Sequence, residues 1–167
     1  QMIQEPYIQY LDNGYTYSSP TYANLWNSTA ADMPTQTSTT HYHEFITKTV
    51  YDPSPVGYKI PNVEAWRGFS ATNTKWVTKE EDEQMRGPGR VYPATGVEQL
   101  FFPALGARDL ILANVGLQGM YASATHDIHK TSGLWRFIRW RFRNENASIV
   151  TGGETSDYTS VRCTPDE

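Results

Sequence analysis

Hydrophobic and polar residues alternate most regularly near the end of the chain. The stretch "LWRFIRWRFR", residues 134–143, contains four arginines, two tryptophans and two phenylalanines. Successive side chains of a β-strand point to opposite faces, so Ile138, Trp140 and Phe142 are predicted to share one face. The arginines at 139, 141 and 143 fall on the other face. We therefore predict a strand whose inner face places Trp140 and Phe142 in the core.

Shorter patterns predict the other elements. The strand candidates are "EFITKTVY" (44–51), "GYKIP" (57–61), "LFFPALGARD" (100–109), "GMYASAT" (119–125), "ASIV" (147–150) and "YTSVRC" (158–163). The prolines of "DPSP" (52–55) end the first of these, because proline lacks the N–H that a ladder requires. Asn62 is the predicted cap of one short helical turn that Gly68 ends. Gly152-Gly153 is predicted to form a turn before the last strand.

Composition agrees with a fold rich in strands and loops. Charged residues make up 19% and aromatic residues 13% of the 167 residues, and Gly and Pro together number 22. This length predicts one domain spanning 1–167, in which 1–44 is the least defined part and a candidate N-terminal extension. The expected class is α+β: a mainly antiparallel twisted sheet with one or two short helices and long loops.

Charge and cysteine content exclude several partners and sites. The formal net charge of −4 disfavours nucleic acid as a partner. No segment is long and apolar enough to insert into a membrane, and the start at Gln1 shows no signal segment. The acidic run Glu80–Glu83 is contiguous rather than spaced like a calcium loop, so a solvated segment is predicted. A single cysteine, Cys163, excludes an intramolecular disulfide framework.

The residues offer little for catalysis or metal binding. "HYH" (41–43) and "HDIH" (126–129) are short histidine pairs without the spacing of a zinc helix, and no metal is predicted. Nucleophile-elbow, phosphate-loop and dinucleotide motifs are absent. We therefore expect no enzyme and no cofactor. The sequons Asn27-Ser28-Thr29 and Asn146-Ala147-Ser148 are interpreted as chance matches unless the source glycosylates secreted proteins.

Several separated motifs together carry a family resemblance. They are "KTVYDPSPVGYKIP" (48–61), "FFPALGARD" (101–109), "NVGLQGMYASAT" (114–125) and "SVRC" (160–163). In this order they resemble the Fibrobacter-succinogenes-major-paralogue type of domain found in many surface proteins of Bacteroidetes. The resemblance covers roughly residues 45–163. It implies a C-type-lectin-like fold with its chain ends brought together, and adhesive modules of secreted or pilus-associated proteins.

The chain departs from that family at two positions. Where Ser54 stands, the family usually has a cysteine, which would be the natural partner of Cys163. We expect Cys163, in a terminal strand with Val161 on the same side, to be buried and slow to react. At Ala122 the family commonly has tryptophan, and the methyl group is expected to leave a surface hollow. The calcium-binding tripeptides of C-type lectins do not occur.

The outer face of residues 134–143 has two interpretations. It is either a solvated sheet face or a recognition surface, since Trp, Tyr and Arg dominate binding hot spots. Some C-type-lectin-like proteins are diversified by retroelements in a late segment, and residues 120–143 resemble such a variable region. The predicted ligand-binding residues are Tyr121, Ser123, His126, Asp127, Trp135, Phe137, Arg139 and Arg141.

The resemblance implies a non-catalytic ligand-binding module of a bacterial cell-surface or fimbrial protein, located outside the cell. Its expected partners are a host or bacterial surface protein, a glycan, or other fimbrial subunits. Two further functions stay open on the same fold: a structural fimbrial subunit and a phage receptor-binding protein. An enzyme is the weakest alternative, because the related formylglycine-generating fold uses cysteine chemistry that a single cysteine does not support.

Overall fold

The computed structural model describes residues 26–27, 46–81, 87–95, 99–108, 112–128, 135–154 and 159–166. Within these ranges the chain forms mostly antiparallel β-sheets with a single very short helix. In chain order the elements are β1 (Tyr58–Lys59), α1 (Glu64–Arg67), β2 (Lys75–Val77), β3 (Gly89–Tyr92), β4 (Leu100–Pro103), β5 (Ala107–Arg108), β6 (Leu112–Ala113), β7 (Gln118–Ile128), β8 (Trp135–Arg143), β9 (Ala147–Glu154) and β10 (Thr164–Pro165). The β-rich, loop-rich character predicted from composition is confirmed for the described residues.

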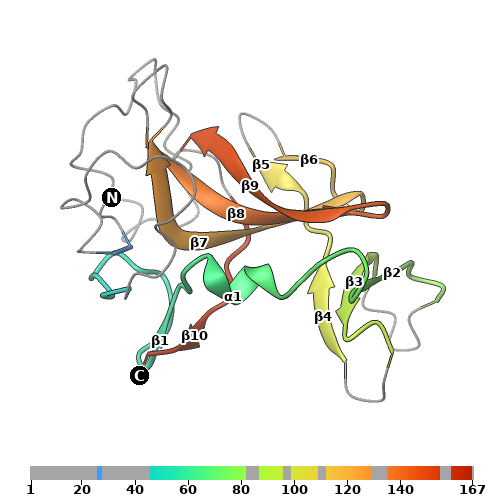
Figure 1. The fold of residues 1–167 in the computed structure, drawn as a ribbon, viewed down its shortest axis with the longest axis horizontal. Helices are drawn as coiled ribbons and strands as arrows, with labels where there is room; N and C mark the ends of the chain where they lie inside the picture. The colour runs from blue at the N-terminus through green and yellow to red at the C-terminus, as the bar shows by residue number, and fades with distance from the viewer. Residues whose placement is uncertain are drawn as a thin grey trace.

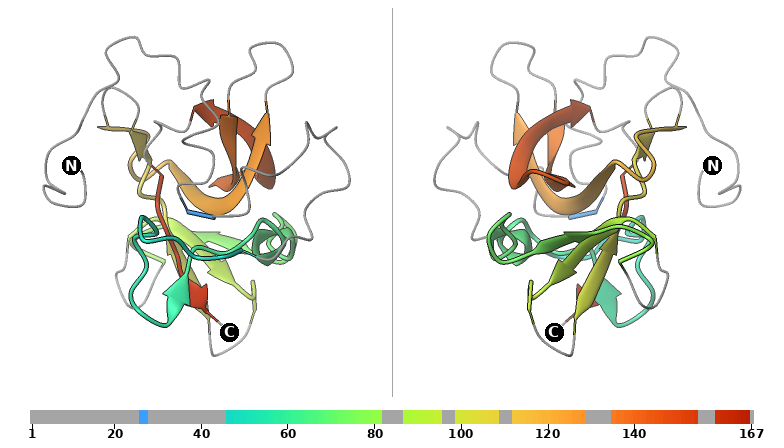
Figure 2. Two further views of the ribbon diagram at one scale, coloured as in Figure 1. Left: turned by 90° about the vertical axis from the view of Figure 1, so that its left-hand side faces the viewer. Right: turned by 90° about the vertical axis from the view of Figure 1, so that its right-hand side faces the viewer.

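Two three-stranded meanders, β7–β8–β9 and β2–β3–β4, make up most of the sheet structure. The strands β5 and β6 form a small hairpin, and β1 pairs with β10. Figure 1 shows the β7–β8–β9 sheet along the long axis of the molecule, with α1 beneath it. Seen from the ends, this curved sheet lies on one side, and α1 and β2–β4 lie on the other (Figure 2). None of the helices in the described ranges has the length and apolar character needed to cross a membrane.

The longest described strands are β7 and β8, and β8 confirms the strand that the alternation over residues 134–143 predicts. Their antiparallel register begins with Gln118 opposite Arg143 and ends with Ile128 opposite Trp135. The register shifts between the pairs Ala122↔Arg139 and His126↔Phe137, so residues 123–125 of β7 stand opposite the single residue Ile138. Such a bulge bends the strand and increases its twist.

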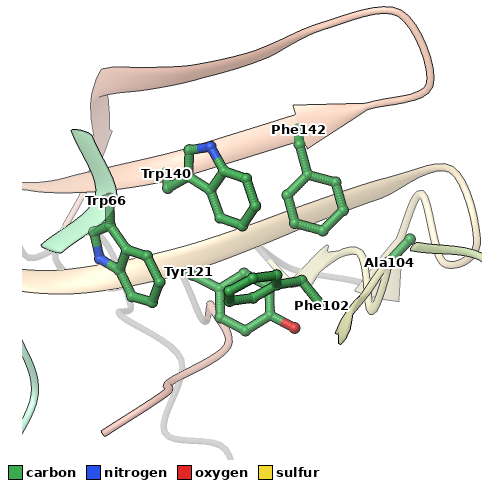
Figure 3. Close-up of a cluster of buried hydrophobic side chains, with 6 residues drawn as sticks. All are labelled: Trp66, Phe102, Ala104, Tyr121, Trp140 and Phe142. Carbon is green, nitrogen blue, oxygen red and sulfur yellow. The ribbon is translucent and has the colours of Figure 1, made fainter. Parts of the chain in front are cut away.

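An aromatic core fills the space between the two layers. Its buried members come from α1, the end of β4, β7 and β8 (Figure 3): Trp66, Phe102, Ala104, Tyr121, Trp140 and Phe142. The indoles of Trp66 and Trp140 are stacked at 6.0 Å and 11°, and Phe102 meets Trp140 edge-on at 4.9 Å. Such ring pairs contribute about 0.5–1.5 kcal/mol each beyond the area they bury. The predicted core positions of Trp140 and Phe142 are confirmed, since neither side chain is exposed.

The predicted helical turn forms α1, but its cap differs from the prediction. The N-cap residue is Val63 and has no side-chain capping bond, so the prediction of Asn62 as the cap is wrong. The Val63 N–H instead donates to Thr125 Oγ1 of β7 at 3.0 Å. Gly68 ends the helix as predicted. A contact to the sheet therefore fixes where this short helix begins.

The strand predicted over 44–51 is wrong for its described residues, 46–51. Lys48 makes one isolated antiparallel bridge with Asn27, and the Thr47 N–H donates to Asn27 Oδ1 at 3.0 Å. The chain then turns at Val50 and Tyr51, both of which are exposed. The alternating pattern did not produce a β-ladder in this segment. The Asn27 side chain accepts the Thr47 N–H, which in a ladder would bond to the main chain of a second strand.

A buried carboxylate organises the loop between this bridge and β1. Asp52 accepts hydrogen bonds from the N–H groups of Ser54 (2.7 Å) and Ile60 (2.9 Å), and Lys48 Nζ lies 3.3 Å from its Oδ1. Lys48 also donates to the carbonyls of Ser54 and Tyr58. Burial works against ionisation of Asp52, but these hydrogen bonds outweigh it and hold the pKa of Asp52 below its ordinary value.

The last described segment differs from the prediction in two respects. The strand begins at Thr164, and Cys163 before it is half-buried, so the expectation of a buried Cys163 inside a strand is wrong. Upstream, Ser160 makes only an isolated parallel bridge with Tyr121. The predicted turn at residues 152–153 is also wrong, because both glycines lie within β9. A register shift between β8 and β9 at that point accommodates them without a turn.

Candidate ligand-binding surface

The predicted site lies on β7 and β8, and the register of these strands separates its residues into two rows. Residues directly opposite each other in an antiparallel pair share a face of the sheet. The row that contains Ile138, Trp140 and Phe142 faces the aromatic core. The other row of β8 contains Trp135, Phe137, Arg139, Arg141 and Arg143. We define this second row, together with its β7 partners, as the arginine face.

Tyr121 and Ser123 do not belong to an exposed surface. Tyr121 stands opposite Trp140, is buried in the core and donates its hydroxyl hydrogen bond to the Pro103 carbonyl at 3.1 Å. Burial raises the pKa of the Tyr121 hydroxyl well above its ordinary range. Ser123 is fully buried in the bulge and donates to the Ile138 carbonyl at 2.6 Å. Their expected place on an exposed surface is therefore wrong, and their contact with a ligand stays a prediction.

Ala122 does not lie at the surface of the described structure, as the expected hollow would require. This residue is fully buried, and its carbonyl accepts a hydrogen bond from Trp66 Nε1 at 3.2 Å. Its N–H donates to the Ser160 carbonyl at 3.0 Å. The expected hollow is corrected, because the main chain around Ala122 is packed against both α1 and the segment that leads to β10.

The three arginines of the arginine face differ in solvent exposure. Arg139 is only 7% exposed, Arg141 is half-buried and Arg143 is exposed. Arg143 Nε donates to the buried Gln118 Oε1 at 2.9 Å, and Gln118 is its register partner at the start of β7. A uniformly solvated face and a uniformly exposed recognition surface are both wrong at Arg139. Only the part of the row at Arg141 and Arg143 offers guanidinium groups to a partner.

The remaining predicted residues lie at the distal end of the same hairpin. His126 is the register partner of Phe137, and Asp127 is the partner of Arg136. His126, Trp135 and Phe137 therefore occupy register positions of the arginine face, and Asp127 occupies the alternate row. The side chains of these four predicted residues lie outside the described part of the structure. So does the connection 129–134 between β7 and β8.

Within the described ranges, no group of three or more His, Cys, Asp or Glu residues is placed to hold a metal ion. His41, His43 and His129 lie outside those ranges. The described acids of the run 80–83, Glu80 and Glu81, are exposed, which confirms the solvated reading for them. Glu81 accepts the Thr78 N–H at 3.0 Å, and this bond lowers the pKa of its carboxyl group.

Sequence reasoning missed a buried cation at the end of the sheet. Arg90 of β3 is 2% exposed and donates to Thr74 Oγ1, to the Thr74 carbonyl and to the carbonyls of Arg143 and Asn144. It thereby fastens the β2–β3–β4 sheet to the turn between β8 and β9. Burial lowers the pKa of Arg90, yet carbonyl oxygens still surround the charge. The glycine-proline context before Arg90 carried no signal of this role.

A second missed feature is a set of exposed aliphatic side chains around the β5–β6 hairpin. They share high exposure within one short stretch of chain: Leu105, Leu112, Val115 and Leu117. Two hydrogen bonds hold the main chain there. The Gly116 N–H donates to the Ala104 carbonyl and the Gly106 N–H donates to the Gln118 carbonyl, each at 2.7 Å. Asn114 and the two glycines have positive φ. These Gly and Asn positions are the sequence signal of tight main-chain turns around the hairpin.

No protein-family model, curated protein or solved structure matches this chain. The candidate surface is accordingly defined by the register, burial and hydrogen bonds of β7 and β8.

Proposed function

We propose that this chain is a non-catalytic ligand-binding module with a C-type-lectin-like fold, exposed on a bacterial cell surface or fimbria. Its binding surface is the arginine face of β7 and β8, from Arg143 to the distal end at Trp135. The ligand is a surface protein or a glycan that carries acidic groups. This proposal extends the family resemblance of the sequence and treats the chain as an adhesion module rather than an enzyme.

The single observation that carries the proposal is the register of β7 and β8. It puts Arg141 opposite Met120 and His126 opposite Phe137 on the row that faces away from the aromatic core. Planar rings stack on sugar or peptide faces, and guanidinium groups pair with carboxylates in bidentate geometry. The fully buried core row holds this surface on a strand of nine residues, and rigid strands position binding groups better than loops.

Burial restricts where ligand specificity is set. Residues 121–125 are all buried, as are residues 138–140. Free variation at such positions would open cavities or bury unpaired polar groups. If the segment 120–143 is diversified by a retroelement, the tolerated variation is confined to positions 126–137 and to half-buried Arg141 and exposed Arg143. Sequencing of close gene copies should show this confinement, and variation spread evenly over 121–125 would contradict it.

Two features support the C-type-lectin-like part of the proposal. The resemblance implies that distant parts of the chain are brought together, and the antiparallel pairing of β1 with β10 joins the first and last described strands. Ser54, where the family has a cysteine, is buried, and its hydroxyl lacks a hydrogen-bond partner among the described residues. The amides of Ser54 and Ile60 share the Asp52 carboxylate. Ile60 directly follows the β1 residue that pairs with Thr164, the neighbour of Cys163.

The variant Ser54→Cys tests this family assignment. We expect it to form a disulfide with Cys163 on oxidation and to gain roughly 3–5 kcal/mol of stability from closing a long loop. Thiol titration of the native and unfolded variant, with peptide mapping, provides the measurement. The matched control is Ser70→Cys, at a half-buried position on the loop after α1. Two free thiols in the oxidised Ser54→Cys protein would contradict the fold assignment.

The binding function is tested by probing arrays of glycans and surface proteins with the full chain. With a captured ligand, Trp135→Ala and Arg141→Ala should each weaken binding by about 2 kcal/mol, because hot spots concentrate in such residues. Glu80→Gln, on the exposed acidic turn, is the control and should leave affinity unchanged. Thermal melting shows whether each variant is folded. Loss of binding only in variants outside the arginine face would overturn the proposed surface.

The exposed aliphatic side chains around β5–β6 favour a second candidate function, a structural subunit that docks against another protein. Monomeric proteins rarely expose several large apolar side chains side by side. Here Leu112 and Leu117 are 60% and 66% exposed on a frame held by hydrogen bonds. Leu117→Asp would abolish assembly in this case and leave ligand binding by the arginine face intact. The two functions are therefore separable by one substitution on each surface.

A further inference from the structure

The chain contains two Asn-X-Ser/Thr sequons, and the structure places their asparagines in opposite surroundings. Asn27 precedes Ser28 and Thr29, and it is 1% exposed. Asn146, in the sequon with Ser148, lies exposed in the turn between β8 and β9. Both sequons carry the same chemical signal, so burial and hydrogen bonding alone distinguish them.

The side chain of Asn27 is part of the folded structure. Its Oδ1 accepts the Thr47 N–H at 3.0 Å, and its main chain forms an antiparallel bridge with Lys48. Next to it, Trp26 packs against a small core of Ile46, Ile60 and Ala124. A sugar on the Asn27 amide would have to occupy this packed space. Glycosylation of Asn27 and the native structure therefore exclude each other.

Asn146 is placed differently. It accepts the Arg143 N–H through its main-chain carbonyl at 2.8 Å, so the described turn bond does not use its side chain. Its neighbours Glu145 and Ser148 are exposed as well. The main chain of the turn is held by β3, because Arg90 Nη2 donates to the Asn144 carbonyl at 2.8 Å. An exposed amide on a fixed hairpin turn can carry a bulky group without disturbing the sheet.

We infer that Asn146 is an acceptor site for an asparagine-linked glycan and that Asn27 is not. The co-substrate is an oligosaccharide linked to a polyprenyl diphosphate, and the catalyst is a transferase that recognises Asn-X-Ser/Thr. A bond forms between Asn146 Nδ2 and the anomeric carbon of the first sugar. The bond from that carbon to the diphosphate oxygen breaks, the polyprenyl diphosphate leaves, and the amide proton passes to a base of the transferase.

This inference requires export of the chain but does not depend on which ligand the chain binds. The β8–β9 turn and the distal end of β7 lie at opposite ends of the sheet (Figure 1). A glycan on Asn146 would therefore stand away from the distal end of the arginine face, at Trp135. A failure of the glycosylation inference can therefore be distinguished from a failure of the binding proposal.

The test is to express the full chain behind a cleavable secretion signal in a eukaryotic cell line and to measure its intact mass before and after peptide N-glycosidase treatment. We expect one glycan per chain, mapped to Asn146 in the secreted protein. Asn146→Gln and Ser148→Ala should each abolish it. Asn144→Gln, an exposed asparagine of the same turn outside any sequon, is the matched control and should retain it.

The outcomes decide the inference in both directions. Secreted protein that carries no glycan, or a glycan that survives Asn146→Gln, would overturn it. A glycan on Asn27 in secreted, folded protein would overturn the inference that Asn27 is not an acceptor. If secretion fails, the glycopeptides of the retained chain are mapped after lysis, and an unmodified Asn146 there equally contradicts the inference. Thermal melting of purified Asn146→Gln shows whether the variant itself folds.

Discussion

The two faces of β8 differ in how evenly they are buried. On one face Ile138, Trp140 and Phe142 are all buried. The Trp140 ring stacks on Trp66 and tilts against Phe142. On the other face burial declines along the strand, from buried Arg139 to exposed Arg143. The aromatic face is thus uniform, whereas the arginine face is graded. The difference teaches that alternation assigns a residue to a face, while its solvation depends on what covers that face.

The largest effect should come from the aromatic face. Trp140→Ala removes a fully buried indole and leaves a cavity among Trp66, Phe102 and Phe142, so we expect a loss of about 3–5 kcal/mol in the free energy of unfolding. Urea denaturation measures this loss. Phe142→Ala should behave similarly. A loss under about 1 kcal/mol, the size of a surface substitution, would show that the face is assigned wrongly.

A smaller but substantial effect is expected at the buried end of the arginine face. Arg139→Ala should lower the free energy of unfolding by about 1–3 kcal/mol, because a buried long side chain contributes packing as well as polar contacts. The matched control on the same face is Arg143→Ala. The two variants are compared by urea denaturation in one buffer. Equal and small losses of unfolding free energy for both variants would contradict the decline in burial from Arg139 to Arg143.

The aromatic face should also respond to alkaline pH through Tyr121. Burial raises its pKa in the folded state, so the folded protein keeps the hydroxyl protonated where the unfolded chain ionises. This contribution is constant below the unfolded pKa of about 10 and is lost as pH rises above it. Tyr121→Phe should cost about 1 kcal/mol at neutral pH, from the bond to Pro103, and should flatten the alkaline fall.

The measurement is the free energy of unfolding between pH 8 and 11, compared with the Tyr121→Phe variant. Tyr92→Phe serves as the control, since that ring is exposed. An alkaline fall that is identical in all three proteins would locate the pH dependence elsewhere in the chain.

The smallest stability effect is predicted at the exposed end of the arginine face. Arg143→Ala should change the free energy of unfolding by less than about 1 kcal/mol, the usual range for surface positions. If the binding proposal holds, the same substitution should weaken ligand binding, and the loss should shrink as salt rises through physiological strength. Calorimetry at two salt concentrations tests both statements. A large loss of stability would mean that the Gln118 bond acts as a structural tie.

Strong alternation made the β7–β8 hairpin and its core predictable. Trp140 and Phe142 could be assigned because large rings at every second position have few alternatives to a core face. The burial of Arg139 could not be predicted, because it depends on segments far away in sequence. The non-strand at 46–51 was missed for a related reason: the Asn27 side chain satisfies the Thr47 N–H there, and side-chain bonds of this kind have no periodic signal.

The candidate site was predicted only in part. Residues of 126–137 were selected by residue type, and the register keeps three of them on one row. Tyr121 was selected by the same rule and is buried because it stands opposite Trp140 on the core row, whereas Ser123 is buried in the bulge at 123–125. Bulges depend on the fit between paired strands, so they cannot be predicted from the sequence of one strand.

The pairing of β1 with β10 has a consequence for how the protein acquires its structure. The partners Tyr58 and Pro165 belong to the first and last described strands, so this pair closes a loop that contains all the other described strands. Non-local pairings of this kind must overcome a large closure entropy before they contribute any stability, and they slow folding. We expect the β7–β8–β9 meander to assemble early and the β1–β10 pair to form last, after synthesis has released both segments.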